Sequence, residues 1–306
     1  MPRVLLFYIK VISEIRTNLR DFFSLILIIQ FSYKTLGLLT HQLAENTANA
    51  LLADKPCLRS FRLSVVVPIC LGNGDNMPIT TCVFDAYGTL FDVAAAARQA
   101  AKEPKFIDLK DSWPALAEYW RLKQLQYTWL RAITSSHTDF WQVTKESLDW
   151  ALEKTGHAGK PEMRKRLLAL YWELQPYPEV SDMLGRLKKA GLKTTILSNG
   201  SPKMLESAVK SAGIQGILDG CLSVESVKVF KPDPKVYNLV NKEFGCSTTE
   251  VLFVSSNGWD VAGAAGYGFN TVWVNRANEP VDRLPWTPQK VLPNLKDIPK
   301  LAGIYD

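Results

Sequence analysis

The spacing of apolar residues divides the chain into stretches of different character. A short apolar run from Thr81 to Phe84 is typical of a buried strand, and it stops at a single acid, Asp85. Residues 92–175 lack strand-like alternation, and their apolar residues recur every three or four positions, which predicts helices. From Pro178 onward short apolar runs alternate with amphipathic segments, which predicts alternating strands and helices.

Particular elements follow from this pattern. The middle stretch predicts helices over residues 113–133, 140–152 and 162–172, with Pro161 in a position that suits a helix start. The last stretch predicts strands over residues 193–197, 220–224, 251–254 and 271–274, with helices between them. Strands that alternate with helices form a parallel, doubly wound sheet. We therefore predict an α/β fold with a Rossmann-like core (residues 77–91 and 176–296), an inserted helical cap (92–175) and a C-terminal tail (297–306).

Residues 1–76 do not fit this plan. The segment Phe22–Leu39 is apolar, but Gln30 and Lys34 leave its uninterrupted part too short to span a bilayer comfortably. No small-residue cleavage site follows at the distance that a signal peptide requires. Met77 leads directly into the predicted first strand, and the codons of Gly74-Asp75 are compatible with a ribosome-binding sequence. We interpret residues 1–76 as an N-terminal extension that is either disordered or translated from a misplaced start.

Composition and charge exclude several classes of function. The 306 residues carry a formal charge of +6 without a basic block interleaved with aromatics, so we expect no nucleic-acid partner, and we expect no membrane partner. Five widely spaced cysteines without a CxxC argue against zinc sites and a disulfide framework, and favour a reducing, cytoplasmic location. His41, His137 and His157 lie outside any motif, which argues against a histidine base.

Polar residues follow several of the predicted strands, at the edge where open α/β sheets bind ligands. They are Asp85 after the first strand, Ser198 and Asn199 after the second, Lys231 in a Lys-Pro-Asp-Pro turn, and Ser255, Asn257 and Asp260 after a later strand. A carboxylate with hydroxyl, amide and ammonium donors can perform nucleophilic catalysis on an anionic substrate. Lys231 can pair with Asp85 and keep it ionised.

Each of these residues also has an ordinary structural interpretation. Asp85 could be a turn acid, Ser198-Asn199-Gly200 a plain loop, Lys231 a solvated lysine, and Asp260 an acid that stabilises a helix N-terminus. Their order at successive strand ends is what argues against coincidence.

The constellation resembles the haloacid dehalogenase superfamily, and most closely its 2-haloacid dehalogenase branch. The resemblance covers about residues 77–296 and is carried by residues 84–93, 119–130, 197–200, 230–237 and 255–264. It implies that Asp85 attacks C2 of a short L-2-haloalkanoate and expels halide with inversion, and that water then hydrolyses the resulting aspartyl ester. It implies that Asp260 activates or orients this water, while Lys231, Ser255 and Asn257 arrange the carboxylates.

The resemblance also assigns the substrate contacts. Arg121, Asn199 and Phe140 would cradle the departing halide, and a guanidinium suits this task because it stays charged and is weakly hydrated. Ser198 and the backbone amides after Asp85, at Ala86 and Tyr87, would bind the substrate carboxylate. The alkyl group would meet an apolar wall of Tyr87, Leu125 and Trp259. Tyr237 would form a hydrogen bond within the site or belong to the helix core.

Two positions bear on which reaction is catalysed. A phosphatase of this fold needs a second acid two residues after the nucleophile, and that residue is Tyr87 here. A phosphatase also needs carboxylates for Mg²⁺, whereas Ser255-Ser256-Asn257 is neutral. We therefore expect a dehalogenase without metal or cofactor. A phosphatase, a phosphonatase and a non-catalytic member of the fold are the alternatives.

Other expectations concern the helical insert. Leu122 stands where the family has a glutamine, which leaves the contacts from the insert, and hence substrate size, open. We expect the partners to be a 2-haloacid and halide, and we expect a homodimer with the aromatic-rich insert as its interface.

Overall fold

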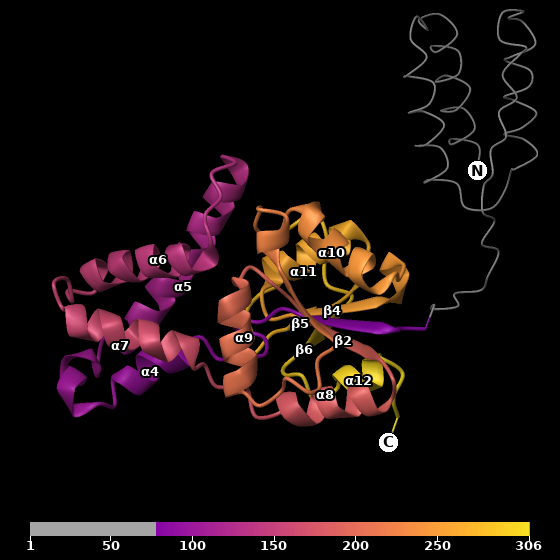
Figure 1. Ribbon diagram of the computed structural model, residues 1–306, viewed down its shortest axis with the longest axis horizontal. Coiled ribbons are helices and arrows are strands. Elements are labelled where there is room, and N and C mark those ends of the chain that lie inside the picture. The colour runs from indigo at the N-terminus through magenta and orange to yellow at the C-terminus, as the bar shows by residue number, and fades with distance from the viewer. Residues whose placement is uncertain (1–77, 306) are drawn as a thin grey trace, which may run out of the picture. The chain divides into compact units, whose positions relative to one another are not determined.

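The computed structural model describes residues 78–305 (Figure 1). The proposed N-terminal extension and the proposed start at Met77 lie outside the described residues. One parallel sheet has the order β3-β2-β1-β4-β5-β6. Its strands are β1 (Thr81–Phe84), β2 (Lys193–Ser198), β3 (Gly220–Ser223), β4 (Val251–Ser255), β5 (Asn270–Val274) and β6 (Lys290–Leu292). The predicted α/β fold with a doubly wound, Rossmann-like sheet is confirmed.

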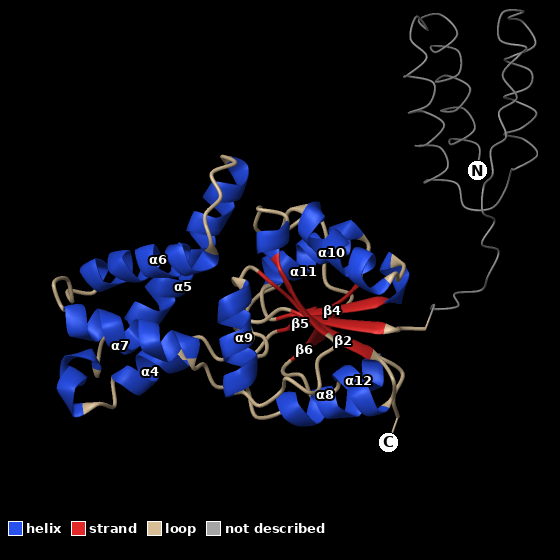
Figure 2. Ribbon diagram, viewed as in Figure 1, coloured by secondary structure: helices blue, strands red, loops and turns tan. Residues whose placement is uncertain are grey.

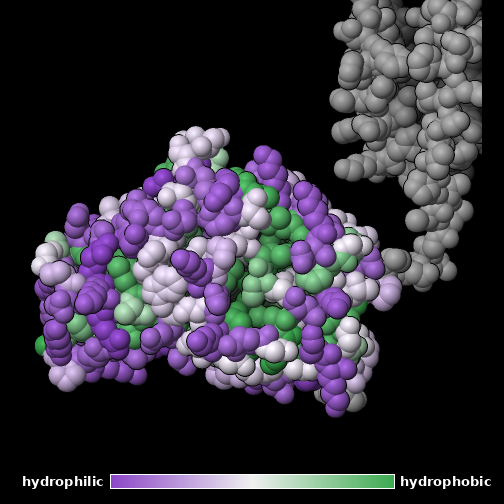
Figure 3. All heavy atoms as spheres, viewed as in Figure 1, coloured by the Kyte–Doolittle hydropathy of each residue, from purple (hydrophilic) through white to green (hydrophobic). Residues whose placement is uncertain are grey.

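Helices cover both faces of the sheet. On one face lie α10 (Pro234–Phe244) and α11 (Gly258–Tyr267), and on the other α8 (Val180–Lys189) and α12 (Ile298–Leu301) (Figure 2). Helix α9 (Pro202–Ser211) connects β2 with β3. Short 3₁₀ turns, η3 (Val224–Ser226) and η4 (Thr248–Glu250), complete this part. On the face in Figure 3, apolar surface gathers mainly over the sheet and its helices.

Strand β1 places Asp85 at the centre of the sheet. All four residues of β1 are buried, and Phe84 is in register with Ile196 of β2 and Val254 of β4. The backbone N–H of Asp85 donates to the carbonyl of Val254 at 2.9 Å. The strand order reverses at β1, and ligands of open α/β sheets bind at the carboxyl ends of strands beside such a point. The first predicted strand thus delivers its terminal acid to the expected binding edge.

The middle of the chain forms a helical insert, which consists of α4 (Ala95–Ala100), η2 (Pro104–Leu109), α5 (Trp113–Ile133), α6 (Phe140–Lys154) and α7 (Pro161–Trp172). In Figure 1 these helices lie together, apart from the sheet. The chain passes from the sheet part to the insert near Asp92 and returns near Gln175, and these two crossings lie side by side. They are hydrogen-bonded to each other: the N–H of Asp92 donates to Gln175 O at 3.0 Å, and the N–H of Tyr177 donates to Leu90 O at 2.9 Å. Among the described helices, none is long and apolar enough to cross a membrane.

Besides the 3₁₀ turns η2, η3 and η4, the structure contains three short elements that the hydrophobic pattern does not predict. They are α4, the edge strand β6 and α12, which lies within the segment expected as a C-terminal tail. Ile298 of α12 is fully buried, and α12 packs against α8. Each has six residues or fewer, so none contains enough periods to stand out from a loop in the sequence.

Candidate active site

Asp85 lies in a cluster of donors, and only 7% of its surface is exposed. Its Oδ1 accepts a hydrogen bond from Lys231 Nζ at 3.1 Å. Its Oδ2 accepts from Thr89 Oγ1 at 2.9 Å and from Asn257 Nδ2 at 3.0 Å. One carboxylate oxygen therefore meets a cation and the other meets two neutral donors. Such donors orient a carboxylate and hold its charge without protonating it.

Lys231 joins the two acids of the site. Its ammonium is fully buried and also donates to Asp260 Oδ2 at 2.8 Å. Burial lowers the pKa of Lys231, but attraction to Asp260 and Asp85 outweighs it, so the pKa lies above its ordinary value. Burial raises the pKa of Asp260, and the Lys231 ammonium opposes this rise without cancelling it. The ammonium of Lys231 is thus a buried cation that lies between two carboxylates.

Tyr237 contacts Asp260 through its hydroxyl and the aromatic core through its ring. Its hydroxyl donates to Asp260 Oδ1 at 2.9 Å, and its ring packs among Phe253, Tyr267 and Phe269. The ring is fully buried, and burial followed by the charge of Asp260 raises the pKa of Tyr237 well above its ordinary value. The expectation of a hydrogen bond within the site agrees with this geometry. A direct contact of Tyr237 with the substrate stays a prediction.

Arg121 reaches this edge from helix α5 of the insert. Its Nη2 donates to Asn257 Oδ1 at 3.0 Å and to the carbonyl of Tyr87 at 3.2 Å. Asn257 in turn donates to Asp85, so one amide side chain connects the guanidinium with the carboxylate. Ser255 is fully buried, and its Oγ accepts from the backbone N–H of Asn257 at 3.1 Å. Ser255 therefore positions Asn257, and it is Asn257 that bonds Asp85.

The loop after β2 brings Ser198 and Asn199 to the same edge. Asn199 Oδ1 accepts from the backbone N–H of Lys231 at 3.0 Å, which ties two strand-end loops together. Ser198 Oγ accepts from the N–H of Gly200 at 3.0 Å. A Cβ at Gly200 would lie 2.8 Å from the ring of Tyr87, so only glycine lets this loop approach so closely.

Aromatic side chains surround the polar cluster. Tyr87 is buried against Phe140 and Tyr171, with ring centroids 5.8 and 5.6 Å away. Burial raises the pKa of Tyr87 well above its ordinary value, so this phenol stays neutral. Leu125 and Trp259 are half-buried, Leu125 on α5 and Trp259 on α11. Ala86 is fully buried and its carbonyl accepts from Leu90 N at 2.9 Å, which forms the turn after Asp85.

Thr89 and Ser256 take part in the hydrogen bonds of the site but were not among the predicted site residues. Thr89 bonds Asp85 through its hydroxyl, and the same oxygen accepts the N–H of Ser256 at 2.8 Å. This bond fixes the loop after β4 against the turn after β1. The Gly88-Thr89 turn marked the place in the sequence, but nothing there distinguishes a hydroxyl that faces Asp85 from one that faces solvent.

Ser112, His157 and Asp108 of the insert resemble a second catalytic site but lack the required proton arrangement, and Asp108 Oδ2 lies 3.9 Å from His157 Nδ1. Ser112 Oγ lies 2.7 Å from His157 Nε2, and Lys160 Nζ lies 3.0 Å from His157 Nδ1. An ammonium can only donate, so Nδ1 accepts and Nε2–H donates to Ser112. Burial, followed by the charge of Lys160, lowers the pKa of His157. A histidine in this tautomer cannot take a proton from the serine.

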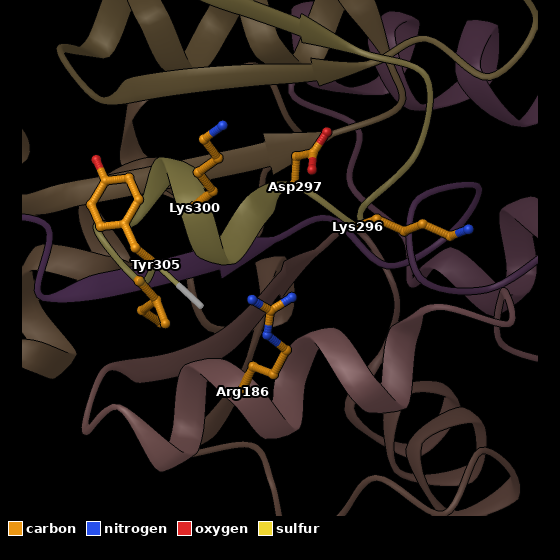
Figure 4. Close-up of a pocket in the computed structure, with 6 residues that line it drawn as sticks. Arg186, Lys296, Asp297, Lys300 and Tyr305 are labelled. Atoms are coloured by element: carbon orange, nitrogen blue, oxygen red, sulfur yellow. The ribbon is translucent and has the colours of Figure 1, made fainter.

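The cavity in Figure 4 lies elsewhere. It measures about 260 Å³ and is lined by Arg186 of α8 and by residues near the C-terminus, Lys296, Asp297, Lys300, Ile304 and Tyr305. None of the predicted site residues lines it. Among residues 78–305, no three His, Cys, Asp or Glu side chains are grouped to hold a metal ion.

Comparisons with known proteins agree with this geometry. The family model of haloacid dehalogenase-like hydrolases matches residues 79–268. The chain is 43% identical over 225 residues to (S)-2-haloacid dehalogenase 1 of Pseudomonas sp. (strain CBS-3), which covers 73% of this chain and 96% of that relative. It is 42% identical over 205 residues to the (S)-2-haloacid dehalogenase of Xanthobacter autotrophicus, covering 66% and 77% respectively.

A solved structure supports the same assignment. The L-2-haloacid dehalogenase of Xanthobacter autotrophicus with chloropropionic acid covalently bound superposes with a TM-score of 0.65 at 36% identity. The match covers 74% of this chain and 100% of that one. The chain belongs to the haloacid dehalogenase-like hydrolases and, within them, to the (S)-2-haloacid dehalogenases.

Proposed function

We propose that the protein hydrolyses short-chain L-2-haloalkanoic acids to D-2-hydroxyalkanoic acids and halide. The observation that carries this proposal is Asp85 itself, a nearly buried carboxylate held by Lys231, Thr89 and Asn257, with a tyrosine where a phosphatase needs its second acid. Family membership and the covalent chloropropionate in the Xanthobacter structure support the same chemistry.

In the first step a carboxylate oxygen of Asp85 attacks C2 of the substrate. The carbon–halogen bond breaks as the carbon–oxygen bond forms, and the halide leaves with the bonding pair. Attack from the opposite side inverts C2, so an L substrate gives a D product. Ser198 and the backbone amides of Ala86 and Tyr87 hold the substrate carboxylate, and Tyr87, Leu125 and Trp259 enclose its alkyl group.

In the second step water attacks the carbonyl carbon of the Asp85 ester. Asp260 orients this water and takes up its proton, and its raised pKa makes it a stronger base than an exposed aspartate. Both oxygens of Asp260 accept hydrogen bonds, from Lys231 and Tyr237, so the carboxylate cannot rotate freely. The 2-hydroxy acid leaves with an oxygen that belonged to Asp85, and Asp85 regains one from water.

Arg121 receives the departing halide, with Asn199 and Phe140 beside it. Replacing Arg121 by Ala removes this positive charge and the bond to Asn257, and we expect kcat for chloride release to fall by about 10²–10³. Steady-state chloride release from L-2-chloropropionate measures this effect. Arg131→Ala, which removes an Arg131–Glu146 pair farther along α5, serves as the matched control. Equal rates in Arg121→Ala and the parent would contradict the assignment.

The remaining features follow from the same proposal. The reaction needs no metal or other cofactor, because Lys231 supplies the positive charge between Asp85 and Asp260 and a leaving halide needs no proton. Residues 92–175 act as a cap over the strand ends, since Arg121 crosses from the insert to the site.

The exposed apolar side chains Leu122, Leu130 and Ile133 on α5 support a homodimer through the insert. A cytoplasmic location agrees with the absence of paired cysteine motifs from the sequence.

One experiment separates this proposal from its alternatives. With EDTA present, we expect chloride release from L-2-chloropropionate, and with Mg²⁺ no hydrolysis of p-nitrophenyl phosphate. A phosphatase would give the reverse result, and a non-catalytic member would give neither product. In a single turnover in ¹⁸O-labelled water, the new hydroxyl of the product is expected to be unlabelled. A labelled hydroxyl would mean direct attack by water, without an aspartyl ester.

A further inference from the structure

Two tryptophans meet between the insert and the sheet. Trp129 of α5 packs edge-on against Trp259 of α11, with ring centroids 5.4 Å apart and an interplanar angle of 81°. Both side chains are half-buried. Trp259 follows Asn257 by two residues and precedes Asp260, so its ring projects from the segment that supplies two members of the polar cluster.

Trp129 belongs to the face of α5 that is turned toward the site. Arg121, Leu125 and Trp129 are four residues apart, a spacing that places them on one side of a helix. Arg121 fixes the direction of this side, because its guanidinium bonds Asn257 and the carbonyl of Tyr87. Leu122 and Leu130 are exposed, in contrast. Trp129 thus lies on the same side of α5 as Arg121 and Leu125, and there it contacts Trp259.

Among the described residues, the indole of Trp259 is held by packing and not by a hydrogen bond of its ring nitrogen. Its Nε1 is buried and has no hydrogen-bond partner among residues 78–305. Among residues 78–305, the edge-to-face contact with Trp129 is the aromatic contact of this ring, and such pairs contribute beyond their buried area. Without Trp129, the ring of Trp259 would gain room to turn away from the strand ends.

We infer that Trp129 is a specificity-determining residue that limits the length of the substrate's alkyl chain. It does so by holding Trp259 as the far wall of the apolar end of the site. This inference rests on the proposed function, because it presumes that a 2-haloalkanoate places its alkyl group against Trp259. Trp129 positions another side chain and takes no part in bond making.

The test compares substrates that differ only in chain length, L-2-chloropropionate and L-2-chlorohexanoate. The ratio of their kcat/KM values, hexanoate over propionate, is measured for the parent, Trp129→Ala and Trp129→Phe. Since accommodating methylene groups in an apolar pocket changes kcat/KM by about tenfold or more, we expect the ratio to rise at least about tenfold in Trp129→Ala. Trp129→Phe keeps an aromatic ring and is expected to raise it less.

Trp141→Ala is the matched control. Trp141 packs against Trp172 inside the insert, and their ring centroids are 4.7 Å apart. Its ratio is expected to stay at the parent value. An unchanged ratio in Trp129→Ala, or an equal rise in Trp141→Ala, would overturn the inference. If Trp129→Ala does not fold, Trp129→Leu decides by the same criterion. A parent enzyme that released no chloride from either acid would instead refute the proposed function.

Discussion

Asp85→Asn is expected to reduce chloride release from L-2-chloropropionate by roughly 10⁴-fold or more, which is typical for the loss of a covalent nucleophile. The amide is a poor nucleophile, and its N–H₂ group would replace one carboxylate oxygen and face donors in either orientation, Lys231 on one side or Thr89 and Asn257 on the other. Steady-state chloride release measures the loss.

Asp111→Asn is the control for this substitution. Asp111 is an exposed acid just before α5, and its replacement is expected to leave the rate unchanged. A thermal melt establishes that Asp85→Asn is folded. Parent-like chloride release from the folded Asp85→Asn variant would rule out the aspartyl-ester route.

Lys231→Met is expected to abolish measurable turnover and to lower the free energy of unfolding by about 3–5 kcal/mol. The side chain is fully buried, so its removal leaves Asp85 and Asp260 facing each other without the cation that joins them. Denaturant unfolding at pH 7 and chloride release measure the two effects. Lys235→Met, at an exposed position four residues later, is expected to change neither.

The loss of stability in Lys231→Met is expected to depend on pH. Burial raises the pKa of Asp260, and the variant lacks the ammonium that opposes this rise. A group with a raised pKa in the folded state stabilises the fold at low pH, and this contribution is lost as the pH rises through that pKa. The difference in unfolding free energy between variant and parent is therefore expected to shrink as the pH falls toward 3.8, the ordinary pKa of aspartate. A constant difference would mean that Lys231 acts by packing alone.

The elements that carry the site were predictable because strong local signals mark them. Trp113–Ile133 has apolar residues at three- and four-residue spacing after a proline near its start, and its predicted bounds are those of α5. The strands that lead to Asp85, Ser198 and Ser255 are almost wholly buried and run into polar residues at their carboxyl ends. In a parallel sheet such ends must meet at one edge, so the polar residues could be grouped without coordinates.

The rest of the site depends on contacts between distant parts of the chain. Thr89 bonds Ser256, 167 positions away, and Arg121 bonds Asn257, 136 positions away. The sequence left open whether Tyr237 bonds within the site or belongs only to the helix core, and the packing of α10 against α11 brings its hydroxyl to Asp260. Local spacing gives the face of a helix on which a residue lies but not what that face meets.

The two adjacent crossings between sheet and insert have a consequence for protein engineering. Because the hydrogen bonds of Asp92 and Tyr177 hold the insert's first and last residues side by side, the whole segment leaves and rejoins the sheet at a single point. Such a segment is a cassette: a foreign helical domain with equally close ends can replace it without stretching the parent strands. Chimaeras between relatives, with breakpoints in these crossings, would then exchange Arg121, Leu125 and Trp129 while retaining Asp85, Lys231 and Asp260.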